Sequence, residues 1–133
     1  MPNESEITFL CQIGNIIYYA LVADNKIDPI EKEAFERELI KVEFDFPFKI
    51  GISNEEAHEI IKKQVNHLLS TSQEPQLLLE RFNRYYINNY DLFSLNNKNS
   101  IWRLINQVCN AKNRKNKSEL VFLSRMKQLF EIE

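Results

Sequence analysis

Apolar residues recur every three or four positions along most of this chain, and few residues interrupt the pattern. Such spacing places the apolar side chains on one face of an α-helix. Only 2 of the 133 residues are glycine and 4 are proline, too few for the turns that many short strands would need. The chain is therefore expected to be all-α. The pattern is clearest in residues 6–23, where the apolar positions are Ile7, Leu10, Cys11, Ile13, Gly14, Ile17, Tyr18, Leu21 and Val22.

Capping residues mark where the next two helices begin. In the segment from Asp28 to Glu31, Asp28 can cap the free amides of a first turn and Pro29 suits the first helical position. Glu31 can reach back to complete a capping box. A second capping box runs from Ser53 to Glu56. These signals predict that helices begin near residues 29 and 54.

The remaining boundaries come from polar stretches. Residues 43–52 alternate aromatic and polar positions as a strand would, but no second strand is present to pair with them, so we expect a packed connector. Residues 70–74 precede a fourth helix, residues 96–100 supply a loop and a cap before a fifth, and residues 112–117 precede a sixth. We therefore expect a single-domain helical bundle of about six helices over residues 1–133. The positions expected to face its core beyond the first helix are Ala34, Phe35, Leu39, Val42, Ala57, Ile60, Ile61, Val65, Leu68, Leu69, Leu78, Leu79, Phe82, Tyr85, Tyr86, Tyr90, Ile101, Trp102, Leu104, Ile105, Val108, Cys109, Leu120, Phe122, Leu123, Met126, Leu129 and Phe130.

Two segments of the chain align at a constant offset of 88 residues. Each is a helix, a tight polar turn, and a second helix with an acidic residue at its third position, Glu31 in the first unit and Glu119 in the second. Two such helix–turn–helix units can bury their apolar faces against each other. The bundle is therefore expected to hold two pseudo-repeated units. The matched positions are Ile16, Ile17, Ala20, Ala23, Asn25, Asp28 and Glu31 with Leu104, Ile105, Val108, Ala111, Asn113, Asn116 and Glu119.

The first turn carries a family resemblance. The stretch YYALVADNKIDPIEKEAF resembles the signature of the tellurite-resistance TerB-like family, approximately Ala-x-Ala-Asp-Gly-x-Ile with a Glu after a short gap. Asn replaces the glycine, a mild change because Asn also tolerates positive φ. The resemblance implies a compact helical bundle without enzymatic activity, of a kind found in tellurite and stress resistance and before the J-domain of a membrane-anchored co-chaperone. It also links the acidic turns to divalent metals. The matching residues are Ala20, Ala23, Asp24, Ile27 and Glu31.

A cation site in this turn is one alternative for function. Asp24, Asp28 and Glu31 would supply oxygen ligands, which favour calcium or magnesium and a weak site. We favour a structural interpretation, in which Asp24 forms an Asx-type turn and Asp28 and Glu31 cap a helix. The second unit has Lys112 where the family pattern has an acid, so a site that needs both turns would be incomplete. The spacing also fails the EF-hand rule.

A second alternative is weak binding of nucleic acid or phosphate by the basic turn 112–117. This turn holds Lys112, Arg114, Lys115 and Lys117. It has no interleaved aromatic residue for base stacking and no known reading motif. Residues 1–66 hold 13 acidic and 7 basic residues, whereas residues 67–133 hold 6 and 10. We favour a solvated turn, or one that pairs with the acidic half of the fold.

The sequence shows no catalytic pattern. No Ser-His-Asp arrangement or glycine-rich phosphate loop can be assembled, and His58 and His67 are too far apart for a metal pair on one helix. Cys11 and Cys109 lie on apolar stripes, which indicates packing and a reducing compartment. No signal peptide is visible, and no apolar run approaches the roughly 18 residues of a membrane span. We expect a soluble cytoplasmic protein that is not an enzyme, whose partner is another protein rather than nucleic acid.

Overall fold

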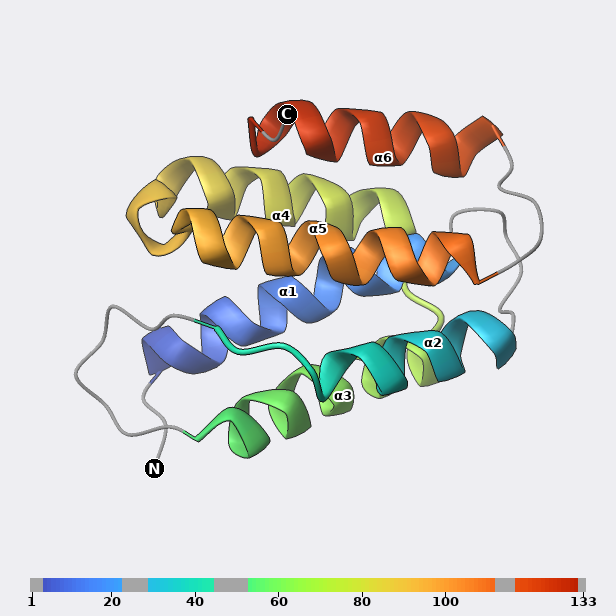
Figure 1. The fold of residues 1–133 in the computed structure, drawn as a ribbon, viewed down its shortest axis with the longest axis horizontal. Helices are drawn as coiled ribbons and strands as arrows, with labels where there is room; N and C mark the ends of the chain where they lie inside the picture. The colour runs from blue at the N-terminus through green and yellow to red at the C-terminus, as the bar shows by residue number, and fades with distance from the viewer. Residues whose placement is uncertain (1–3, 23–28, 45–52, 112–116, 132–133) are drawn as a thin grey trace.

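The computed structural model describes residues 4–22, 29–44, 53–111 and 117–131, and within these ranges the chain forms helices and no strand. The all-α prediction is confirmed (Figure 1). The six α-helices of the described residues are joined by one short 3₁₀ turn, η1. The elements are α1 (Glu4–Val22), α2 (Pro29–Leu39), α3 (Asn54–Thr71), α4 (Pro75–Asn88), η1 (Tyr90–Leu92), α5 (Leu95–Asn110) and α6 (Lys117–Leu129).

Helix α1 lies at the centre of the bundle and packs against α3, α4 and α5 (Figure 1). Its apolar stripe is wide enough to contact three neighbours, and its central side chains are removed from water. By length and composition alone, helix α1 is also long and apolar enough to cross a membrane. The core helix of a bundle passes the same test, and 61% of the relevant window is buried here. The fully buried positions of α1 include Phe9, Leu10, Ile13, Ile16, Ile17 and Leu21.

Close packing of α1 on α3 depends on a glycine. A Cβ atom at Gly14 would lie 2.8 Å from Cγ and 2.9 Å from Cβ of Gln64 on α3, which is closer than real contacts allow. Beside it, the amide Nε2 of Gln64 donates to Oδ1 of Asn15 over 2.8 Å. The small residue therefore lets two helices approach, and the amide pair satisfies polar groups that the approach buries.

The start of α3 agrees with its capping signal, and the start of α5 differs from the prediction. The predicted cap of α2, Asp28, lies outside the described residues. Ser53 accepts a hydrogen bond from the backbone amide of Glu56 over 3.1 Å, as predicted for α3. For α5, the prediction of a loop and cap at residues 96–100 is wrong. The cap is Ser94, which accepts from the amide of Asn97 over 3.1 Å. Asn97 itself is fully buried and donates to the carbonyl of Leu92, so this polar side chain belongs to the helix rather than to a loop.

Most positions expected in the core are buried, with three clear exceptions, of which Ile7 in α1 is 40% exposed. Leu120 is 52% exposed and Tyr90 is 51% exposed. In α6 the neighbouring Glu119 is buried instead, so the inward face begins one residue earlier than apolar periodicity suggests. Of the expected connector 43–52, residues 45–52 lie outside the described residues. Phe44 before them is buried, and its ring lies 6.5 Å from that of Phe9.

The repeat is visible in the positions of the helices. Shifted by 88 residues, the range of α1 overlaps that of α5, and the range of α2 overlaps that of α6, as the sequence predicts. The second helices nevertheless pack differently. Helix α2 packs on α5, the first helix of the other unit. Helix α6 also packs on α5, which is the first helix of its own unit, and it makes no extensive contact with α1 in the described part of the chain.

Candidate functional site

The acidic turn gives no assembled cation site in the described residues. Asp24 and Asp28 lie outside those residues, so their positions relative to Glu31 are not described. Glu31 is 1% exposed at the third position of α2. Within residues 4–22, 29–44, 53–111 and 117–131, no three His, Cys, Asp or Glu residues are grouped to hold a metal. The calcium or magnesium site therefore stays a prediction.

The basic turn is described only at its last residue. Lys112, Arg114 and Lys115 lie outside the described residues, so binding of nucleic acid or phosphate by this turn also stays a prediction. Lys117 is the first residue of α6 and is exposed. It lines a cleft that sequence reasoning did not predict.

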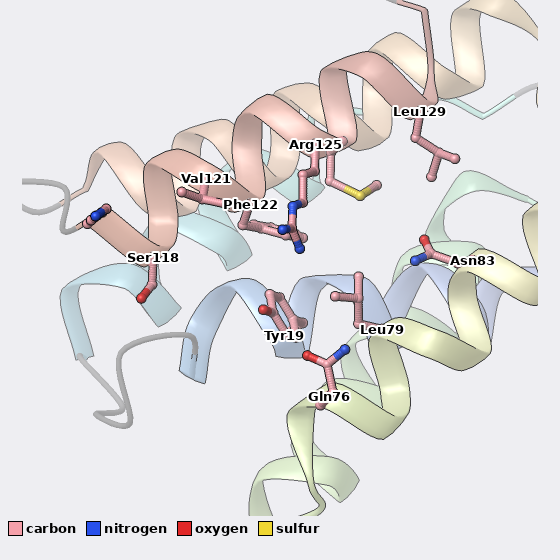
Figure 2. A pocket seen from close by; sticks show the side chains of 11 residues that line it. Tyr19, Gln76, Leu79, Asn83, Ser118, Val121, Phe122, Arg125 and Leu129 are labelled. Carbon is pink, nitrogen blue, oxygen red and sulfur yellow. The ribbon is translucent and has the colours of Figure 1, made fainter.

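This cleft lies between α4 and α6, with Tyr19 of α1 between them (Figure 2). It has a volume of about 480 Å³, which falls within the usual range for ligand pockets. Its walls combine apolar side chains with nearly as many polar and charged ones. The lining residues are Tyr19, Gln76, Leu79, Asn83, Lys117, Ser118, Val121, Phe122, Arg125, Met126 and Leu129.

Helical spacing explains why these residues share one cleft. On α6, successive lining residues such as Ser118, Phe122 and Met126 are four apart, so they form one stripe along the helix. This stripe spans residues 117–129, a length of about 18 Å at 1.5 Å per residue. On α4, residues 76–83 give a shorter facing wall. The cleft is therefore elongated along α6.

The base of the cleft is well packed, and its rim is open to solvent. Phe122 and Met126 are 3% and 2% exposed, whereas Val121 is 41% exposed. The ring of Phe122 lies 4.7 Å from that of Tyr19, and this contact joins α6 to α1. An apolar group that entered the cleft would therefore find ordered aromatic and aliphatic side chains beneath it.

Contacts with α5 and with α4 hold α6 in place beside the cleft. Toward α5, the indole nitrogen of Trp102 donates to the carbonyl of Leu123 over 3.5 Å, and the Nζ of Lys127 lies 5.7 Å from the centre of the Trp102 ring. Toward α4, the hydroxyl of Tyr86 donates to the carbonyl of Leu129 over 3.3 Å. These contacts hold α6 against α5 and hold the C-terminal end of α6 against α4. The cleft lies between α4 and the rest of α6.

The charge of the cleft is positive. Lys117 and Arg125 both line it, and its described lining holds no carboxylate. Neither cation forms an ion pair with another described residue within 4.0 Å. Figure 2 shows Arg125 reaching from α6 into the cleft toward Leu79 and Tyr19. Eight residues of helix separate the two cations, about 12 Å along the axis.

The described lining offers hydrogen-bond donors, cations and apolar side chains for binding. It contains no histidine, cysteine or carboxylate that could accept a proton from Ser118 or Tyr19. The two histidines lie elsewhere, on α3. The ring of His58 hydrogen-bonds the carbonyl of Val42 over 2.7 Å, and His67 is exposed.

This cleft could hardly be predicted from the sequence. Its residues come from three helices that are far apart along the chain, and each apolar one also fits an ordinary core position. Arg125 is one cation of a periodic helix, with no motif around it. The usable signals were the positive second half of the chain and the cluster of cations that ends at Lys117.

Comparison with known proteins identifies no related protein. A scan against models of protein families gives no match, and no match is found among curated proteins or among solved structures.

Proposed function

We propose that this chain is a non-enzymatic interaction module that binds another protein through the cleft between α4 and α6. The observation that carries the proposal is the combination of an open apolar cleft and two cations without a described acidic partner. A cleft of this volume with apolar side chains and a few convergent polar groups is the default candidate for a binding site. The mixture of apolar side chains, hydrogen-bond donors and cations in the described lining supports a binding role.

The TerB-like resemblance belongs to the same proposal. The positions of the helices support it, because α1 and α2 overlap α5 and α6 when shifted by 88 residues, and two related helix–turn–helix units are what the resemblance implies. By this resemblance the module would act in the cytoplasm as an accessory protein in tellurite, metal or another stress response. Deletion of its gene should then lower tolerance to tellurite or a related stress. Unchanged tolerance across such stresses would remove this part of the proposal.

The binding role is tested with the chain as bait and a variant that spoils the cleft. Val121→Asp places a carboxylate at the exposed rim, so the fold should tolerate it while an apolar partner surface is repelled. Arg81→Gln is the matched control, because Arg81 is exposed on α4 and does not line the cleft. A partner is expected to bind the native chain and the control, and to be lost with Val121→Asp when the purified components are titrated. A partner that binds Val121→Asp equally well would place the interaction on another face.

A further inference from the structure

We propose that the cleft between α4 and α6 takes an acidic amphipathic helix of the partner protein, with two carboxylates about two turns apart on either side of an apolar ridge. This inference rests on the proposed binding function and adds the chemistry of the occupant. It follows from the shape of the cleft, its base and the placement of its two cations.

The shape suits side chains presented by a helix. The cleft runs about 18 Å along α6, which is the length of a helix of about twelve residues. A partner helix that lies along such a groove inserts residues at positions i, i+3, i+4 and i+7. The half-buried Leu79 and the buried Phe122 and Met126 give these residues an apolar surface to cover.

The charges set where acids must lie on the partner. Lys117 and Arg125 are about 12 Å apart along α6. Two acids at positions i and i+7 of a helix are about 10.5 Å apart and share one face, so both can meet a cation while the residues between them fill the groove. Asn83 and Gln76 on the opposite wall offer amide donors to the same carboxylates.

A small amphiphile with one head group fits these observations less well. A single carboxylate can neutralise one of the two cations but cannot reach the other across about 12 Å. A nucleic acid also fits poorly, because the apolar base of the cleft lies between the cations and its aromatic rings pack against each other rather than standing free for stacking. A partner helix satisfies both cations and covers the apolar base.

The experiment is a selection from a displayed library of helical peptides. Peptides of about sixteen residues, long enough to cover the cleft, are randomised on one face and selected against the native chain, Arg125→Glu and Arg81→Glu. The native chain and the Arg81→Glu control should enrich peptides with acids at i and i+7 and apolar residues between them. Arg125→Glu should weaken these peptides by roughly tenfold or more, because the pairing becomes a like-charge contact. It should instead enrich peptides with Lys or Arg at one of the two acidic positions.

Several outcomes would overturn the inference. One is the enrichment of basic or uncharged peptides, and another is no enrichment at all. A third is an acidic motif whose binding does not change with Arg125→Glu. If decanoate binds the native chain and is lost with Arg125→Glu while no peptide is enriched, the occupant is a small amphiphile. Self-association that Arg125→Glu abolishes would identify a second copy of this chain instead. A partner protein that binds the Val121→Asp and Arg125→Glu variants with the affinity of the native chain would show that the chain binds a protein but not through this cleft.

Discussion

The ring of Tyr19 on α1 lies 4.7 Å from the ring of Phe122 on α6, at the base of the cleft between α4 and α6. This contact joins two helices that otherwise make no extensive contact in the described residues. Phe122 therefore has two roles, since it anchors α6 and also forms the apolar surface that an occupant would cover.

Removing the Phe122 ring should destabilise the fold. Phe122→Ala leaves a cavity beside Tyr19 and is expected to lower the free energy of unfolding by about 3–5 kcal/mol. The neighbouring exposed Val121 gives a matched control, because Val121→Asp should stay within about 0.5 kcal/mol of the native chain. Urea denaturation followed by circular dichroism measures both. Equal stability of the two variants would mean that α6 does not depend on this contact.

Replacing Gly14 should strain the contact between α1 and α3. Gly14→Ala gains about 1 kcal/mol of helix propensity but overpacks against Gln64, which costs about 1–3 kcal/mol, so a net loss of stability is expected. Thermal unfolding of Gly14→Ala and of the same change in a Gln64→Ala background separates the two effects. The cost should fall only in part in the second background, because Cγ of Gln64 is then absent while the Cβ of residue 64, 2.9 Å away, remains. A stabilised Gly14→Ala chain would show that the helices separate easily.

The two observed serine caps should each contribute to stability. Ser53→Ala and Ser94→Ala remove the side-chain acceptors of α3 and α5, and each should lower the free energy of unfolding by about 0.5–2 kcal/mol. Ser124→Ala serves as the control, since Ser124 is exposed within α6 and alanine is the better helix former there. Denaturant midpoints compare the three variants. If Ser94→Ala had no effect, the start of α5 would need another explanation.

Alkaline pH should destabilise the bundle through its buried tyrosines. Burial raises the pKa of Tyr85 from its ordinary value near 10 to about 12, and burial also raises the pKa of Tyr18 and of Tyr86. The folded state thus holds the phenol protons more tightly than the unfolded chain. This stabilisation is fully present below pH 10 and is lost as the pH rises from 10 toward 12. Tyr85→Phe should flatten that loss in urea titrations at increasing pH, and an unchanged slope would show that Tyr85 does not contribute.

Local signals in the sequence were sufficient for much of the fold. The Ser53 cap and the 88-residue offset predicted where helices begin, because capping and periodicity depend on residues within one or two turns. The start of α5 was missed because three asparagines suggested a loop, whereas Asn97 is buried and hydrogen-bonded inside the helix. Leu120 was expected to face the core only because it is apolar. Its neighbour Glu119 shares the buried position of Glu31 in the first unit, and that correspondence was the better guide to the face of α6.

The candidate site needed the tertiary structure. The repeat predicts related helices but does not specify their packing partners, and the cleft exists because α6 packs on α5 rather than along α1. Arg125 and Tyr19 are more than 100 residues apart in the chain and meet only in that arrangement. The charge excess of the second half indicated the sign of the site but not its place.

The most direct test of the account is a map of backbone amide shifts in the ¹⁵N-labelled chain when a selected acidic peptide or captured partner is added. The account predicts that the largest shifts lie in residues 76–83 and 117–129 and that they disappear with Arg125→Glu. Shifts confined to α2 or α3, with those two segments unaffected, would contradict it.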